Sequence, residues 1–210
     1  QPELMLIQIN DLVGTTWVID PLSVDIGPLG NLLCSKDVVL HSGAQDLAIL
    51  FRETQQSPNQ VFDTQVAAGM IGLRHPMRLS DIVSLLLDEP MDKSETLSDW
   101  SSRPLSNEQL SYAARDVEVL GGLSEHLRLK LKEMNRLHWL DEECHALIQS
   151  SQTPTRTNHT WVHWDIAPLL EPTAQRTLAC LFEWRNQKGR DKNQPANFML
   201  SDGLALDIAR

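Results

Sequence analysis

The sequence predicts an α/β fold followed by a smaller region made of helices. Two apolar runs, residues 4–9 (LMLIQI) and 15–20 (TTWVID), surround the turn-like residues DLVG and are typical of an antiparallel pair of strands. Strand patterns then alternate with helical ones, which favours a sheet flanked by helices. Because the polar stretch 150–158 (SSQTPTRTN) indicates a linker, we expect one domain in residues 1–149 and another in residues 159–210.

The elements of the first domain follow from their residue patterns. PLGNLLCS is helical in character, and DVVLHS (37–42) is typical of a strand that ends in the small-residue turn SGA. Leu47, Leu50 and Phe51 recur at helical spacing in QDLAILFRET. QVFDTQVAAGMIGL predicts a short strand followed by a helix.

A long helix is predicted to begin after Ser106. Ser106 and Gln109 form the capping box S-x-x-Q, and the helix continues through SYAARDVEVL. Gly121-Gly122 weaken it, but LSEHLRLKLKEMNRLHWL resumes helical spacing. In the last domain, PTAQRTLACLFEWRNQKGRDKN predicts one strong helix, and a second begins after Pro195.

Charge and composition limit the classes of protein to which this chain can belong. The 210 residues carry a net charge of −10, and residues 1–150 hold 11 Lys and Arg against 22 Asp and Glu. This acidity repels a nucleic-acid backbone over most of the surface, and it fits either a solvated acidic face or a site for divalent cations. The sequence has no spanning apolar stretch and no signal-peptide pattern. Three distant cysteines indicate reduced thiols, so we expect a cytoplasmic protein with no membrane partner.

Three aspartates and the single tyrosine are the first candidates for a functional site. Tyr112 and Asp116 are four residues apart, so a helix places them on one face. Asp is unfavourable in mid-helix; the alternative to a function is a solvated Asp beside a half-buried Tyr. Asp46 follows a strand end, where open α/β sheets bind ligands, although it also complements a helix dipole. Asp63 ends the next strand and suits a metal site or a helix cap.

In order and spacing, five segments resemble the ribonuclease D family, the tyrosine-bearing branch of the DEDD 3′-5′ exonucleases. The segments are IDPL, LHSGAQDL, FDTQ, LDEPMDKSETLSDWSSRPL and YAARDV. The resemblance covers almost the whole chain, and QRTLACLFEWRNQKGRDKNQPANFMLSDGLALDIAR resembles the start of the helical HRDC domain of ribonuclease D. It implies an RNase H-like exonuclease domain, a mixed sheet flanked by helices, followed by a partial all-α HRDC-like domain.

The resemblance implies a metal-dependent 3′-5′ exoribonuclease that acts on structured RNA with a free 3′ end, such as tRNA precursors. Such enzymes hold two Mg²⁺ or Mn²⁺ ions with four acidic residues, because hard cations need oxygen ligands. Asp46 and Asp116 match two of these ligands, and Tyr112 matches the tyrosine that orients the attacking water. A tyrosine pKa of about 10 makes it a poor base at neutral pH, so the metal must do most of the activation.

The other two carboxylates of the family belong to an Asp-x-Glu motif on its first strand, ahead of the segment that LMLIQI resembles. Here Glu3 is the only acid before Leu4, so half of the expected metal site is absent. We expect that the sequence lacks an N-terminal part of the natural protein; the alternative is a catalytically inactive nucleic-acid-binding or scaffold homologue. Residues 1–210 alone are expected to be inactive. Because the family's first strand lies centrally in the sheet, its absence should leave neighbouring strands with unpaired backbone groups.

Further residues are candidates for supporting roles. Lys93, Trp100 and Arg103 lie just before the tyrosine helix, where they either meet RNA or belong to a loop anchored by the tryptophan. His41 and Asp63 are expected beside the metal ligands, the histidine as a packed residue and the aspartate as a cap or structural hydrogen-bond acceptor. The basic residues of the predicted helix in the last domain either contact phosphates or form a solvated face.

Overall fold

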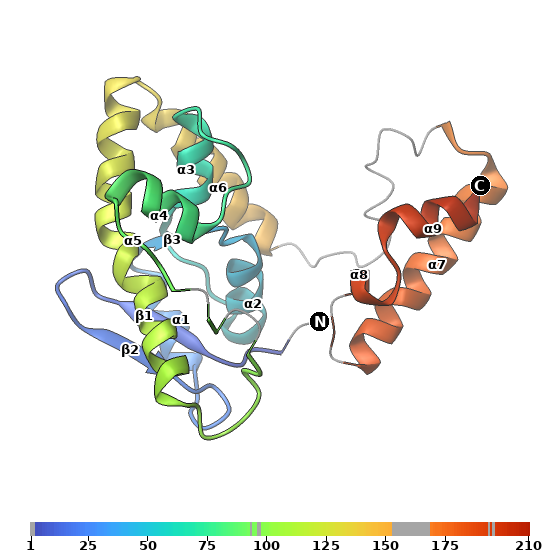
Figure 1. Ribbon diagram of the computed structural model, residues 1–210, viewed down its shortest axis with the longest axis horizontal. Helices are drawn as coiled ribbons and strands as arrows, with labels where there is room; N and C mark the ends of the chain where they lie inside the picture. Colours follow the sequence, from blue (N-terminus) through green and yellow to red (C-terminus); the bar gives the residue numbers. More distant parts are fainter. Residues whose placement is uncertain (1–2, 93, 96–97, 153–168, 193, 195) are drawn as a thin grey trace. The chain divides into compact units, whose positions relative to one another are not determined.

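The computed structural model divides the chain into two compact units, each described separately below (Figure 1). The larger unit comprises Leu4–Thr153, and the smaller comprises Gln1–Glu3 with Pro154–Arg210. The boundary after Thr153 falls within the predicted linker 150–158. The residues that the structure describes are 3–92, 94–95, 98–152, 169–192, 194 and 196–210.

The first two strands form the predicted antiparallel hairpin. β1 (Ile7–Asn10) pairs with β2 (Thr16–Ile19). The turn between them is held by a side chain, because Asn10 Oδ1 accepts the Leu12 N–H at 2.8 Å. Asparagine commonly stabilises turns in this way, so the local sequence favours the turn of the hairpin.

The elements that follow form a parallel β-α-β arrangement, as the alternating pattern predicts. The two parallel strands lie in register with Leu40 opposite Asp63, so their carboxyl ends meet at one edge. A helix crosses over between the strands, and another helix starts directly after the second strand. The elements are α1 (Gly27–Leu33), β3 (Asp37–Leu40), α2 (Ala44–Thr54), β4 (Gln60–Asp63) and α3 (Thr64–Met70).

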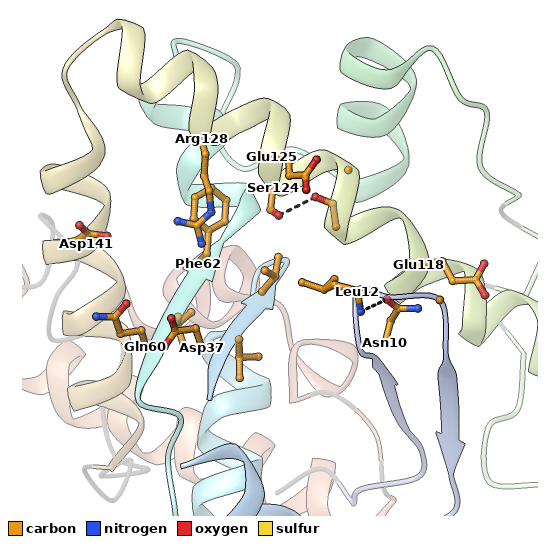
Figure 2. Close-up of a pocket in the computed structure, with 16 residues that line it drawn as sticks. Asn10, Leu12, Asp37, Gln60, Phe62, Glu118, Ser124, Glu125, Arg128 and Asp141 are labelled. Atoms are coloured by element: carbon orange, nitrogen blue, oxygen red, sulfur yellow. Dashed lines mark hydrogen bonds between the residues drawn. The ribbon is translucent and has the colours of Figure 1, made fainter. Parts of the chain in front are cut away.

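A groove separates the two pairs of strands. Among the described residues β1 pairs only with β2, and β3 only with β4, so the predicted mixed sheet is divided in two. The groove has a volume of about 570 Å³, and its walls include Asn10 and Leu12 of the hairpin, Val38 of β3 and Phe62 of β4 (Figure 2). The backbone edges that face it have no strand partner in the described chain, as expected if a central strand is missing.

Helix α5 (Asn107–Glu133) spans the larger unit, and it borders the groove (Figures 1 and 2). The structure confirms its capping box: Ser106 Oγ accepts the Gln109 N–H at 3.2 Å, and Gln109 Oε1 accepts the Ser106 N–H at 2.9 Å. The helix runs through Gly121-Gly122 without a break, because a buried apolar stripe holds it on both sides of them. That stripe is Val119, Leu123, Leu127 and Leu131.

The core of the larger unit collects buried apolar side chains from β4, from α5 and from four other helices. Cys144 of α6 (Leu137–Gln152) is buried, and its Sγ accepts the Asp63 N–H at 3.4 Å. Each fully buried leucine in this core contributes roughly 1.5–3 kcal/mol relative to an exposed one. All three cysteines are free thiols, as the sequence indicates.

The smaller unit is helical in its described part. α7 (Pro172–Asp191) packs against α9 (Asp202–Ala209) through Leu178, Phe182 and Ala205, all almost fully buried. Arg185 is also buried, with 5% of its surface exposed. This basic residue of the predicted helix serves the core rather than a solvated face. α8 (Ala196–Met199) completes the unit.

Two elements differ from the expectation. α4 (Leu79–Leu87) is a helix for which the sequence analysis gave no element. It begins after Arg78 with no side-chain cap, so the usual start signal is missing. α6 continues to Gln152, so the first three residues of the predicted linker are helical.

Candidate active site

Helix α5 places Tyr112 and Asp116 one turn apart on the same face. Both residues line a cavity of about 440 Å³ beside the first turns of the helix. The ring of Trp100 lies 6.1 Å from the Tyr112 ring, centroid to centroid, and tilted by 47°. This is an ordinary aromatic contact, and it restricts the orientation of the tyrosine.

Asp116 is a half-buried carboxylate without a compensating partner. Within the described residues it forms no hydrogen bond and no ion pair. Burial raises the pKa of Asp116 from its ordinary 3.8 to about 6, because the charged form loses water. Such a side chain is suited to a bound cation, which would restore the stability of the charged form.

Asp46 lies in the first turn of α2, after the small-residue turn that follows β3. That turn requires glycine, because a Cβ on Gly43 would lie 2.5 Å from Leu40 Cδ1. Asp46 is exposed by its surface area, yet its carboxylate is partly desolvated by the surrounding protein. This desolvation, followed by the negative charge of Asp63, raises the pKa of Asp46. Like Asp116, it has no hydrogen bond or ion pair to any described residue.

Asp63 has the structural role that the sequence analysis favoured. It is the N-cap of α3 and accepts the Gln65 N–H at 2.8 Å and the Val66 N–H at 3.3 Å. It also accepts the Ser42 N–H at 3.1 Å and the Gly43 N–H at 2.8 Å. The end of β4 is thereby fastened to the turn that starts the helix of Asp46.

His41 is packed, as expected, and both of its ring nitrogens have partners. Nδ1 lies 2.9 Å from Thr64 Oγ1, and Nε2 lies 3.1 Å from the Met77 carbonyl oxygen. Burial lowers the pKa of His41, while the charge of Asp63 opposes that change. A neutral imidazole that bridges these segments supports the turn before Asp46.

Of the three predicted RNA contacts, the structure places two. Arg103 uses all five N–H donors of its guanidinium within the protein. They reach both carboxylate oxygens of Asp20 and the carbonyls of Met5, Trp100 and Ser102. Trp100 packs on Tyr112 as described above, whereas Lys93 lies outside the described residues. The geometry therefore makes Arg103 a clamp for this loop, and its use in RNA binding stays a prediction.

Asp46 and Asp116 fit a divalent cation by their chemistry, since each offers hard carboxylate oxygens without competing ion pairs. The described chain contains no group of three His, Cys, Asp or Glu side chains placed to share a metal, so these two carboxylates do not make a metal site by themselves. β3, which leads into the Asp46 turn, and α5, which carries Asp116, both border the groove between the strand pairs. A strand seated there would therefore lie next to β3, whose end leads to the Asp46 turn, and next to α5, which carries Asp116.

Arg115, which was not among the candidates from the sequence, lines the same cavity as Tyr112 and Asp116. Its guanidinium forms an ion pair with Glu89, and the distance from Nη2 of the arginine to Oε2 of the glutamate is 2.5 Å. The sequence did contain a signal for this residue, because Arg115 lies three residues after Tyr112 and so faces the same side of the helix.

Across the described residues, no helix is both long and apolar enough to span a membrane.

Comparison with known families and proteins places these residues in context. Residues 1–132 match the family described as 3′-5′ exonuclease. The chain is 34% identical to ribonuclease D of Desulfotalea psychrophila over 214 residues, which cover 99% of this chain and 57% of that protein. It is 35% identical to ribonuclease D of Pseudomonas paraeruginosa over 212 residues, covering 100% of this chain and 56% of the relative. The chain thus spans a little over half the length of these relatives.

Solved structures share the fold. The crystal structure of Escherichia coli RNase D, described as an exoribonuclease involved in structured RNA processing, aligns with a TM-score of 0.74 and 28% identity over 100% of this chain and 56% of that one. Brucella melitensis NrnC with bound Mg²⁺ aligns with a TM-score of 0.63 and 30% identity over 77% of this chain and 79% of that one. The α/β architecture described above is therefore that of a known group of nucleases.

Proposed function

Because this chain belongs to the 3′-5′ exonuclease family, we propose that it is a ribonuclease D-like exoribonuclease that removes nucleotides from the 3′ end of structured RNA. Its similarity to ribonuclease D along almost its whole length supports this activity, and tRNA precursors are the substrates we expect. The observation that carries the proposal is the face of α5 on which Tyr112 lies one turn from Asp116, a half-buried carboxylate with no described partner.

Asp46 and Asp116 have the role of holding two divalent cations, Mg²⁺ or Mn²⁺. When bound, these cations supply an activated water and stabilise the charge on the phosphate during in-line displacement. Tyr112 orients that water through its hydroxyl, and the Trp100 ring keeps the tyrosine in place. Asp63 and His41 act indirectly, since they fasten the turn from which the helix of Asp46 begins.

The groove between the strand pairs is the proposed position of an Asp-x-Glu strand. The resemblance to ribonuclease D implies such a strand at the centre of the sheet. The two unpaired edges in the described chain support this position, since one added strand would pair with β1 on one side and β3 on the other. Two cations held about 3.5–4 Å apart need more ligands than two carboxylates, so residues 1–210 alone should bind Mg²⁺ weakly and release no nucleotides.

The smaller unit is proposed to be the start of an HRDC-like domain, on the resemblance of its sequence and its helical form. Any phosphate contacts of this unit come from residues other than Arg185. That side chain is buried, and its Nη1 pairs with Asp202 Oδ1 at 2.5 Å. The three free thiols support a reducing compartment, and we place the protein in the cytoplasm.

The experiment compares residues 1–210 with a version that carries an upstream Asp-x-Glu strand, on RNA with a free 3′ end. We expect Mg²⁺-dependent nucleotide release only from the extended version. In that version Asp46→Asn and Asp116→Asn should each abolish release while the fold is retained, because asparagine keeps the shape and removes the charge.

A matched control is Asp81→Asn. Asp81 lies in the first turn of α4, as Asp46 does in α2, but α4 does not begin at the turn after β3 that Asp63 fastens. It should leave activity unchanged. Equal metal-dependent activity with and without the strand would contradict the position of the site, and an inactive extended version would favour a scaffold protein.

A further inference from the structure

The cavity beside the first turns of α5 poses an electrostatic problem for an RNA substrate. Its described charged side chains include three acids, Asp92, Glu108 and Asp116. RNA brings one negative charge per phosphate, and the cavity lies in a region where acids outnumber bases two to one. A phosphate that enters the cavity therefore needs a protein cation beside it.

Arg115 is the cation among the described side chains that line this cavity. It follows Tyr112 by three residues and directly precedes Asp116, so it is positioned by the same rigid helix as these two site residues. Its side chain retains 44% of its exposure, so it is accessible to a ligand.

The guanidinium of Arg115 has donors to spare. In the described chain only one of its five N–H groups has a partner, Oε2 of Glu89 at 2.5 Å. Arg103, by contrast, has all five donors occupied by protein oxygens. The remaining N–H groups of Arg115 can donate to two oxygens of a phosphate, a geometry that arginine favours.

The ion pair with Glu89 is weak enough to be replaced. Both partners are about half exposed, and such surface pairs contribute about 0–1 kcal/mol. A charge-assisted, bidentate phosphate contact is stronger, so a phosphate would compete successfully with the carboxylate.

We propose that Arg115 binds a backbone phosphate of the RNA near the cleaved end, and that Glu89 occupies the guanidinium until the RNA arrives. This inference rests on the proposed nuclease function and adds a substrate-binding residue to it. It also predicts a direction that a structural role would not: removing Glu89 should improve RNA binding.

The test measures the affinity of the enzyme for a labelled RNA with a single-stranded 3′ end by fluorescence anisotropy across a series of salt concentrations. Arg115→Gln should weaken binding about 5–10-fold and reduce the salt slope by about one. Arg115→Lys should recover part of the affinity, because charge returns without the bidentate geometry. Glu89→Gln should strengthen binding about 2-fold or more. In turnover assays of the version that carries the upstream Asp-x-Glu strand, Arg115→Gln should raise KM with little change in kcat.

The matched control is Arg52→Gln, because Arg52 also forms an ion pair with a glutamate, Glu53, and lines neither cavity. It should leave RNA affinity unchanged. If Arg115→Gln binds as the wild type does, with the same salt slope, the inference is overturned while the nuclease function stands. If the wild-type enzyme neither binds nor degrades RNA, the proposed function fails, and the inference fails with it.

Discussion

Replacing Asp116 with asparagine should stabilise the metal-free protein while it destroys the metal site. The carboxylate of Asp116 is half-buried and has no described partner, so its negative charge opposes folding when no cation is bound. Asparagine has the same shape and no charge. The loss of function and the gain of stability should therefore appear in the same variant.

The magnitude follows from the pKa of Asp116, which burial raises from 3.8 to about 6. In the folded state the group holds its proton to higher pH than in the unfolded state, so the stability of the wild type falls as pH rises through this range. The full difference corresponds to about 3 kcal/mol at 1.4 kcal/mol per pKa unit. Because the group is only partly shielded from water, we expect Asp116→Asn to gain about 1–2 kcal/mol at pH 8 and little at pH 4.

Urea unfolding followed by circular dichroism at pH 4 and pH 8, with EDTA present, measures this difference. Other groups titrate as well, but they contribute equally to both proteins and cancel in the comparison. A variant that is less stable than the wild type at pH 8, or equally more stable at both pH values, would refute the reasoning. In either case the charge of Asp116 would not be what lowers the free energy of unfolding of the wild type.

Three further changes test other parts of the structure. Tyr112→Phe should lower kcat about 10²-fold with unchanged RNA affinity, since the hydroxyl is assigned to the water; normal turnover with weak binding would contradict that role. Asp63→Ala should cost about 2–4 kcal/mol in urea unfolding, because four backbone N–H groups lose a charged acceptor; a loss below 0.5 kcal/mol would argue against the role. Arg185→Met should destabilise the smaller unit by about 2–3 kcal/mol through the loss of its bonds to Leu200 and Asp202, whereas the exposed Arg176→Met should change unfolding little.

The sequence predicted those elements whose ends are marked by nearby residues, such as a capping box or a polar turn. The capping box of Ser106 and Gln109 marked the start of α5, and apolar runs around a polar turn marked the hairpin of β1 and β2. Helix α4 lacks a side-chain cap to mark its start, and it was missed although its apolar residues recur at helical spacing: Leu79, Ile82, Val83 and Leu86.

The same distinction holds for the candidate site, where local spacing predicted one part and contacts between distant segments determine the other. Spacing along one helix was enough to pair Tyr112 with Asp116, because residues four apart share a face. The partners of the two arginines could not be predicted from the sequence, since Asp20 lies 83 residues from Arg103 and Glu89 lies 26 residues from Arg115 along the chain. A loop arginine and a helix arginine look alike in sequence, and only tertiary contacts show which one retains unused donors.

The five bonds of Arg103 have a consequence for the dynamics of the site. They join the backbone of Met5 and the carboxylate of Asp20 to the loop that carries Trp100. Segments fastened in this way open together in local unfolding, with a shared free energy. We therefore expect amide hydrogen exchange at the Trp100 loop to be coupled to opening of the segments that flank the β1–β2 hairpin, so the surroundings of Tyr112 depend on residues almost a hundred positions earlier in the chain.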